Sequence, residues 1–362
     1  MRSYLTEHGA SRYAFYGYGK IAVRDGLDLL LAERPETTNV VLPAYLPHGI
    51  IESFRDAGLE PRYYRCDRRL RPNLEDVERL LDEESLAAML THYFGHPQPP
   101  EDVSTMRTLC EQHDAFLIDD NAHAPLSTSE GRLLGTLGDI GITSLRKLLP
   151  VPNGALLFVS NESLSETDLT RSEVRSRYGL DDYRYCARSL GRSVSGYPVA
   201  REALSAIRWL RDRIPGPRTA VDHKVADGGE DPRSIYEEAK GPMSRLALRV
   251  FDRTDPQRVI AARRANYRVW DRAIRDVEGV EPVFPQLPDG VCPQYYTVFV
   301  DDPDDLGPLE GVSAPWPPLP HEISDDAEFE TENYLATHLH TLPVHQGLDL
   351  KGLGPLVPEK RR

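Results

Sequence analysis

Lysine and cysteine are both scarce in this chain of 362 residues. Only six of its 43 basic residues are lysines, and its four cysteines lie far apart, at positions 66, 110, 186 and 292. Such spacing matches neither a zinc site nor a disulfide framework. We therefore expect reduced thiols and no bound metal.

Long apolar runs and an excess of positive charge are also missing. No stretch approaches the ~18 consecutive apolar residues of a membrane-spanning helix, and residues 1–8 lack the apolar core of a signal peptide. The formal net charge of −14 argues against general nucleic-acid binding, which needs a basic surface. We expect a cytoplasmic protein that binds neither membranes nor nucleic acids.

The first 160 residues predict an α/β fold. Short apolar segments alternate with helical segments, which is typical of a mostly parallel central sheet with helices on both faces. The expected strands are residues 39–43, 61–66, 86–92, 115–120, 138–144 and 155–159, and the expected helices are residues 21–31, 49–57, 73–82 and 103–113.

The remainder of the chain has a different pattern. Helical stretches dominate residues 161–240, which also contain an acidic, glycine-rich loop at 227–232. A long helix over residues 255–277 is followed by residues of strand type. We expect a large α/β domain over residues 1–245, with a helical insertion at about 161–240, and a small C-terminal α+β domain over residues 246–362.

Two expected strand ends carry the residues that pyridoxal phosphate (PLP) chemistry needs. Lys147 follows the apolar segment 138–144, so desolvation should lower the pKa of its amine and make it nucleophilic. Asp120 ends the segment 115–120, where a carboxylate can keep the pyridine nitrogen protonated while the lysine forms an imine. Side chains alternate on a strand, so only one of Asp119 and Asp120 can face a cofactor. The alternative that both carboxylates cap the next loop stays open.

Other side chains near these strand ends suit a phosphate and an aromatic ring. The glycines of the Gly-Tyr-Gly run at 17–19 open a helical segment, whose N–H groups can cradle a phosphate. The hydroxyl of Ser144 can reach the same phosphate. His123, three residues beyond Asp120, can touch the ring oxygen or the substrate. A structural role is expected for His92, His96, His321 and His345.

Several short motifs lie along the chain in a fixed order. They are VLPAY at 41–45, DAG at 56–58, THYFGHP at 91–97, LIDDNAHA at 117–124, GRLLGTLGD at 131–139, MS at 243–244, RRAN at 263–266 and TLPVH at 341–345. Together they resemble the DegT/DnrJ-type sugar aminotransferases, a branch of the fold-type I PLP-dependent enzymes. This resemblance implies a fold-type I PLP-transferase architecture.

The resemblance implies roles for the residues around the cofactor ring. Lys147 would be the residue that carries the cofactor, and Asp120 would pair with the ring nitrogen. His123 falls where the family usually has a glutamine beside the ring. Tyr45 or His48 would supply the stacking contact on the ring face.

The resemblance also implies how the phosphate would be bound. Ser144 and the backbone around Tyr18 and Gly19 would contact it. Lys240 stands near the position of a family asparagine that reaches the phosphate of the neighbouring subunit, so a homodimer with shared active sites is implied. The spacing of three residues between Ser144 and Lys147 departs from the family's usual five.

The implied activity is transfer of an amino group by a PLP-dependent homodimer. The small-molecule substrates would be an amino donor, glutamate in the simplest case, and a nucleotide-linked keto-sugar. The Ser-x-x-Lys spacing keeps open another fold-type I enzyme, such as a cyclitol aminotransferase, a lyase or a desulfurase. The departures from the family also keep open a non-catalytic homologue with a binding or regulatory role, although intact Lys147 and Asp120 weigh against it.

Overall fold

The structure is a computed structural model, and most of the chain is described in it. The described residues are 1–123, 125–164, 174–180, 182–186, 240–275, 277–300, 319–348 and 350. Most of the predicted insertion, including its acidic loop at 227–232, lies outside these residues.

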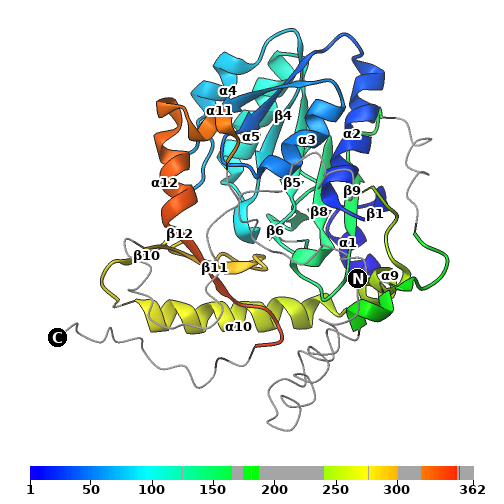
Figure 1. The fold of residues 1–362 in the computed structure, drawn as a ribbon, viewed down its shortest axis with the longest axis vertical. Helices are drawn as coiled ribbons and strands as arrows, with labels where there is room; N and C mark the ends of the chain where they lie inside the picture. Colours follow the sequence, from blue (N-terminus) through cyan, green and yellow to red (C-terminus); the bar gives the residue numbers. More distant parts are fainter. Residues whose placement is uncertain are drawn as a thin grey trace, which may run out of the picture.

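A seven-stranded mixed sheet forms the centre of the molecule (Figure 1). Its strands are β1 (Tyr13–Tyr16), β2 (Asn39–Pro43), β3 (Glu60–Tyr64), β4 (Ser85–Thr91), β5 (Phe116–Asn121), β8 (Ile140–Ser144) and β9 (Ala155–Val159). The order is β1-β9-β8-β5-β4-β2-β3, and the five strands from β8 to β3 are parallel. Strands β9 and β1 continue the sheet in antiparallel pairs. The predicted α/β fold class is therefore confirmed.

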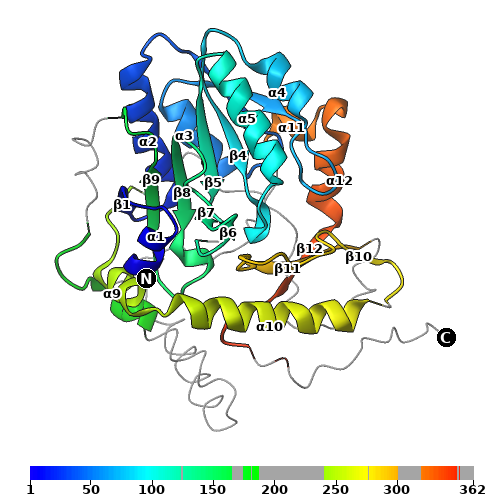
Figure 2. The ribbon, with the colours of Figure 1, turned by 180° about the vertical axis from the view of Figure 1, so that it is seen from behind.

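Helices cover both faces of this sheet. They are α2 (Gly19–Glu33) and α3 (His48–Asp56) on one face, and α4 (Leu74–Leu80) and α5 (Pro100–Gln112) on the other, as Figures 1 and 2 show from opposite sides. The strand pattern explains this, because successive side chains alternate between faces. On β5, Ile118 packs into the cluster of α2 and α3, whereas Leu117 packs into the cluster of α4 and α5.

The C-terminal part forms its own antiparallel sheet, β10-β11-β12. Its elements are β10 (Val280–Pro282), β11 (Tyr295–Val300), β12 (Leu339–Pro343), α10 (Pro256–Ile274), α11 (His321–Ser324) and α12 (Glu330–His338). Trp270 of α10 and Tyr296 share one buried cluster, and Leu335 of α12 and Phe299 share another, so helices cover both faces of this sheet too.

Helix α9 (Arg245–Arg253) packs with the N-terminal half of the chain. Phe251 lies in one cluster with Phe15 and Phe158, together with residues of α1 (Arg2–Glu7). A division of the chain at residues 245/246 remains a prediction, and this packing places α9 with the larger part.

The predicted elements differ from the observed ones mainly at their ends. Asn73, where the predicted helix 73–82 begins, caps α4, since its side chain accepts a hydrogen bond from Asp76 N. Helix α2 begins at Gly19, two residues before the predicted start, and α10 ends at Ile274, three residues before the predicted end. Short elements missed by the sequence analysis include α1, β1 and the hairpin of β6 (Thr128–Ser129) and β7 (Arg132–Leu133).

The sequence predicted reduced thiols and no membrane-spanning helix. Cys66, Cys110 and Cys292 are buried free thiols, and Cys186 is an exposed one. No helix in the described part of the chain is long and apolar enough to cross a membrane.

Candidate active site

Lys147 lies just beyond the carboxyl end of β8, in a single turn of 3₁₀ helix, η2 (Leu145–Lys147). The backbone of this turn is fixed, because Leu145 N donates to Gly154 O (2.9 Å) and Leu149 N donates to Leu145 O (2.7 Å). The Lys147 side chain is half-buried. Burial lowers the pKa of its amine to about 8, against the opposing attraction of Asp120.

Asp120 is buried at the end of β5, the strand next to β8. Its Oδ1 accepts from Ala122 N (2.8 Å), and its Oδ2 accepts from Thr91 Oγ1 (3.4 Å). Burial raises the pKa of this carboxyl, while the Ala122 hydrogen bond and the charge of Lys147 oppose the rise. Buried Asp120 and half-buried Lys147 therefore form an interacting acid and base.

Asp119 points to the other face of β5. Its Oδ2 accepts hydrogen bonds from the backbone N–H groups of Gly135 (2.8 Å) and Leu137 (2.7 Å). These bonds tie the segment before β8 to β5. Of the two neighbouring carboxylates, only Asp120 interacts with Lys147, and Asp119 has a structural task.

The imidazole of His123 is buried beside the same pair of strand ends. Its Nδ1 accepts a hydrogen bond from Phe94 N (2.9 Å), and its ring stacks on Phe94 with centroids 5.3 Å apart. Burial and the charge of Lys147 hold the pKa of His123 well below its ordinary value. The ring is therefore neutral, and since Nδ1 accepts, the proton must sit on Nε2. His123 is thereby a hydrogen-bond donor of fixed direction, as a glutamine amide would be.

The N-terminus of α2 lies near these residues. Gly154 N donates to Gly17 O (2.7 Å), and the guanidinium of Arg146 lies over the ring of Tyr18, 5.1 Å from its centroid. A Cβ added at Gly19 would meet no atom within 4 Å, whereas one added at Gly17 would overlap the carbonyl oxygen of Gly241. Gly17 is thus packed against Gly241, whereas the space beside Gly19 is open.

Three other residues were predicted to contact the cofactor ring or its phosphate. Tyr45 is fully buried, and its ring is tilted against Tyr93 at 5.7 Å. His48 begins α3, with Nε2 3.7 Å from Glu52 Oε1. Lys240 is exposed, next to the glycine that packs on Gly17. The ring-stacking and phosphate roles of these residues remain predictions.

The histidines expected to be structural occupy varied surroundings. His92 and His96 are buried; His96 stacks on Phe284 at 4.0 Å, and burial lowers its pKa to about 3. His321 and His345 are exposed. Within the described residues, no group of three or more acidic, histidine or cysteine side chains could hold a metal ion.

The donor set fits PLP. An amine with a pKa near 8 can react with the aldehyde at neutral pH, a buried carboxyl can hold a proton on the ring nitrogen, and a neutral imidazole can donate to the ring oxygen. The open space at Gly19, at the start of a helix of 15 residues, suits a phosphate.

Two residues of this site were missed by the sequence analysis. Phe94 has a left-handed backbone with φ of 54°, and Arg146 contacts Tyr18 across the site. Neither residue has a composition or spacing signal. Phe94 belongs to a bulky type that avoids positive φ, and only its place within the motif at 91–97 singles it out.

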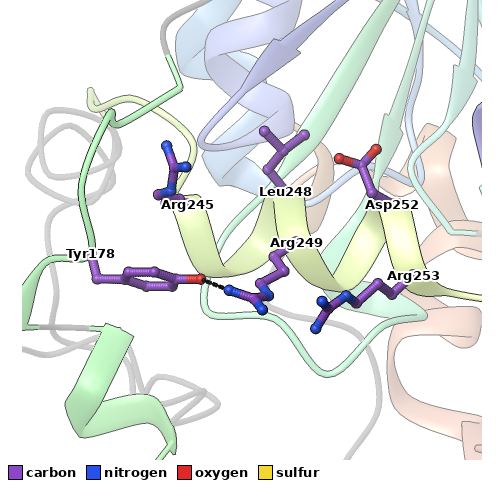
Figure 3. Close-up of a pocket in the computed structure, with 6 residues that line it drawn as sticks. All are labelled: Tyr178, Arg245, Leu248, Arg249, Asp252 and Arg253. Carbon is purple, nitrogen blue, oxygen red and sulfur yellow. Dashed lines mark hydrogen bonds between the residues drawn. The ribbon is translucent and has the colours of Figure 1, made fainter.

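A surface cavity of about 300 Å³ lies elsewhere, along α9 (Figure 3). It is lined by Tyr178, Arg245, Leu248, Arg249, Asp252 and Arg253, and Arg249 donates to the Tyr178 hydroxyl (3.0 Å). No residue of β5, β8 or η2 lines it, so it is separate from the site around Lys147.

Comparisons with known proteins show which family the chain resembles. Residues 25–192 match the model of the DegT/DnrJ/EryC1/StrS aminotransferase family. The chain is 27% identical over 265 residues to dTDP-4-dehydro-2,3,6-trideoxy-D-glucose 4-aminotransferase of Saccharopolyspora spinosa. The aligned region covers 72% of this chain and 58% of that protein. The chain is also 27% identical over 128 residues to the GDP-perosamine synthase of Vibrio cholerae, which covers 34% of each. The chain thus spans less than two thirds of these curated relatives.

Solved structures extend the likeness to the fold. Helicobacter pylori PseC, an aminotransferase involved in the biosynthesis of pseudoaminic acid, superposes with a TM-score of 0.65 at 14% identity, over 97% of this chain and 86% of PseC. The resemblance to the DegT/DnrJ-type aminotransferases that the motifs indicated is therefore confirmed, since residues 25–192 match the model of that family.

Proposed function

We propose that this protein is a PLP-dependent aminotransferase that moves an amino group from an amino acid, glutamate in our proposal, to a nucleotide-linked keto-sugar. The single observation that carries the proposal is the arrangement of Lys147, Asp120 and His123 at neighbouring strand ends, where the charge of the Lys147 amine acts on both the carboxyl and the imidazole. The names of the curated relatives support a nucleotide-linked sugar as the acceptor.

Each residue has a task that follows from its surroundings. The lowered pKa of Lys147 leaves roughly a tenth of its amines neutral at pH 7, so Lys147 can hold the cofactor and, once released, move a proton at the substrate Cα. Asp120 would hold a proton at the ring nitrogen. His123 would donate from Nε2 to the ring oxygen. The bound cofactor would supply an electron sink.

The phosphate would lie at the start of α2, against the backbone of Tyr18 and Gly19 and the hydroxyl of Ser144. Tyr45 or His48 would stack on the face of the cofactor ring. We further propose a homodimer in which Lys240 reaches the partner's site. The chain would form two domains, over residues 1–245 and 246–362.

Reductive trapping tests the proposal. The purified protein is incubated with PLP, reduced with borohydride and digested, and the modified peptide is identified by mass spectrometry. We expect one modified lysine, Lys147, and none in Lys147→Met. Lys20→Met, which removes the lysine at the start of α2, is the matched control and should leave the labelling of Lys147 in place. Modification elsewhere, or none after loading, would contradict the proposal.

A further inference from the structure

Arg263 has an unusual position for a charged side chain. It projects from α10 and is only 3% exposed. It interacts electrostatically with Cys292, Tyr295 and His345, and no ion pair joins it to a carboxylate in the described part of the chain. Burying an unpaired cation is costly, so its hydrogen bonds must offset the loss of water.

Those hydrogen bonds reach three separate segments. Nη2 donates to Leu148 O (3.2 Å), Nη1 donates to Pro293 O (3.0 Å) and Gln294 O (3.1 Å), and Nε donates to Gln346 Oε1 (3.0 Å). An apolar residue could fill this space, but only the planar fork of a guanidinium can bind several carbonyls in fixed directions.

The first of these segments carries Lys147. Leu148 directly follows Lys147, and its carbonyl accepts a second hydrogen bond from Gln346 Nε2 (3.0 Å). Arg263 and Gln346, which also bind each other, thus hold the same carbonyl from two sides. The turn that bears the reactive amine is tied to the C-terminal part of the chain.

The second segment leads to His123. Gln294 N donates to Phe94 O (2.8 Å), and Phe94 N donates to His123 Nδ1 (2.9 Å). The left-handed backbone of Phe94 is strained for a bulky residue, and these bonds at both of its peptide groups keep it in that state. Through Gln294, Arg263 therefore supports the bond that fixes the proton of His123.

The third segment is held firmly by α10 itself. Asn266 Nδ2 donates to His345 O (3.1 Å), and Trp270 Nε1 donates to Pro343 O (2.8 Å). Arg263, Asn266 and Trp270 share one helix face because they are spaced by three and four residues. Gln346 is thus presented by a backbone that α10 holds in place.

We propose that Arg263, with Gln346, is a positioning residue that sets the Lys147 amine and the His123 ring in one fixed arrangement. This inference rests on the proposed function only for the importance of Lys147 and His123. Neither Arg263 nor Gln346 touches reacting atoms in this proposal; they act through Leu148, Gln294 and Phe94.

The test reads the Lys147 amine directly, without cofactor. The cofactor-free protein is pulse-labelled with a limiting amine acylating reagent across pH 6–11, and the pH dependence of Lys147 labelling gives its pKa. Asp120, Arg146 and His123, the groups that face Lys147, stay unchanged in every variant. Loosening the turn admits water to the Lys147 amine, which raises its pKa because the charged form is then better solvated.

In Arg263→Gln we expect the Lys147 pKa to rise from about 8 toward 10.5, by about one unit. Gln346→Met removes one of the two bonds to Leu148 O and should give a smaller rise. The matched control is Arg264→Gln, since the neighbouring Arg264 also donates to carbonyls, those of Pro288 and Val291, outside the site. It should leave the Lys147 pKa unchanged.

Unfolding by urea separates positioning from general stability. A merely structural role would lower the free energy of unfolding without moving the Lys147 pKa of the folded protein, and that result would overturn the inference. If Arg263→Gln does not fold, Gln346→Met decides alone. Failure of PLP trapping on Lys147 in the wild type would contradict the proposed function. It would leave the positioning role of Arg263 open to this test, because the labelling uses no cofactor.

Discussion

The imidazole Nε2 of His92 lies 2.9 Å from Asp119 Oδ1, with both side chains completely buried. His92 Nδ1 accepts from Gln98 N (2.9 Å), so the proton of a neutral ring sits on Nε2, toward the carboxylate. Together with the two backbone donors at Gly135 and Leu137, this contact gives Asp119 a structural role, in which it ties the segment before β8 to β5. Asp120, one residue later, is left to interact with Lys147.

This arrangement predicts opposite phenotypes for two adjacent substitutions. Asp119→Asn weakens charge-assisted bonds to buried N–H groups, each of which contributes about 1.5–3 kcal/mol, so the free energy of unfolding should fall by about that amount. Asp120→Asn should leave stability unchanged or raise it, because burial already disfavours the Asp120 carboxylate. Urea unfolding of the cofactor-free proteins measures both.

For amino-transfer activity, Asp120→Asn should be the more damaging of the two substitutions. An amide cannot hold a proton on the ring nitrogen, so Asp120→Asn should bind PLP yet lose about one to two decades in amino-transfer rate. Asp119→Asn should keep most of its rate below its unfolding temperature. A crippled Asp119→Asn beside a nearly normal Asp120→Asn would show that the wrong carboxylate has been assigned.

The pKa of Lys147 makes stability depend on pH. Its folded pKa, about 8, is below the usual 10.5, so between these values the unfolded chain binds more protons than the folded one. Stability contributed by this residue therefore rises with pH across that window, and below pH 8 the lysine is destabilising by at most about 3 kcal/mol. Lys147→Met removes the effect.

The measurement is the free energy of unfolding of cofactor-free wild type and Lys147→Met at pH 7, 8, 9 and 10. We expect the methionine variant to be more stable at pH 7 and its advantage to shrink as the pH rises. A constant difference over this range would mean that Lys147 is not desolvated. Lys20→Met serves as the control, because Lys20 lies outside the buried pair.

The sequence predicted Lys147 and Asp120 for a local reason. Each follows an apolar run whose length and alternation fix where the strand ends, and parallel strands end at one edge of the sheet. The sheet itself could be anticipated in the same way. The antiparallel strand β1 could not, because its four residues gain their place only by pairing with β9, more than 130 residues later.

Arg263 and Phe94 mark the limit of sequence reasoning at this site. Arg263 reaches a carbonyl 115 residues away, and Phe94 is held by His123 and Gln294 from two distant segments. Nothing in the local pattern around either residue encodes those partners. Likewise, the resemblance implied a stacking role for Tyr45 or His48, but the full burial of Tyr45 against Tyr93 depends on tertiary packing.

Substitution of Lys240 tests whether active sites are shared between subunits. Lys240 is exposed, and the neighbouring Gly241 packs on Gly17 of the same chain. The lysine therefore starts close to its own phosphate loop, from which it would extend to a partner's. A lysine–phosphate contact is charge-assisted and stronger than the neutral hydrogen bond of an amide, so Lys240→Ala should weaken PLP retention while leaving the Lys147 linkage intact.

Mixed dimers separate the two possibilities. Lys147→Ala subunits are exchanged with Lys240→Ala subunits, and activity is compared with each parent. If Lys240 serves the partner's site, half of the sites in every mixed dimer carry neither lesion, and random exchange in a two-fold dimer should restore roughly a quarter of the wild-type activity. Lys147→Ala mixed with Asp120→Asn is the control, and it cannot recover because both residues serve their own chain's site. If neither mixture recovers activity although mass spectrometry verifies subunit exchange, Lys240 acts in its own chain's site or outside any site.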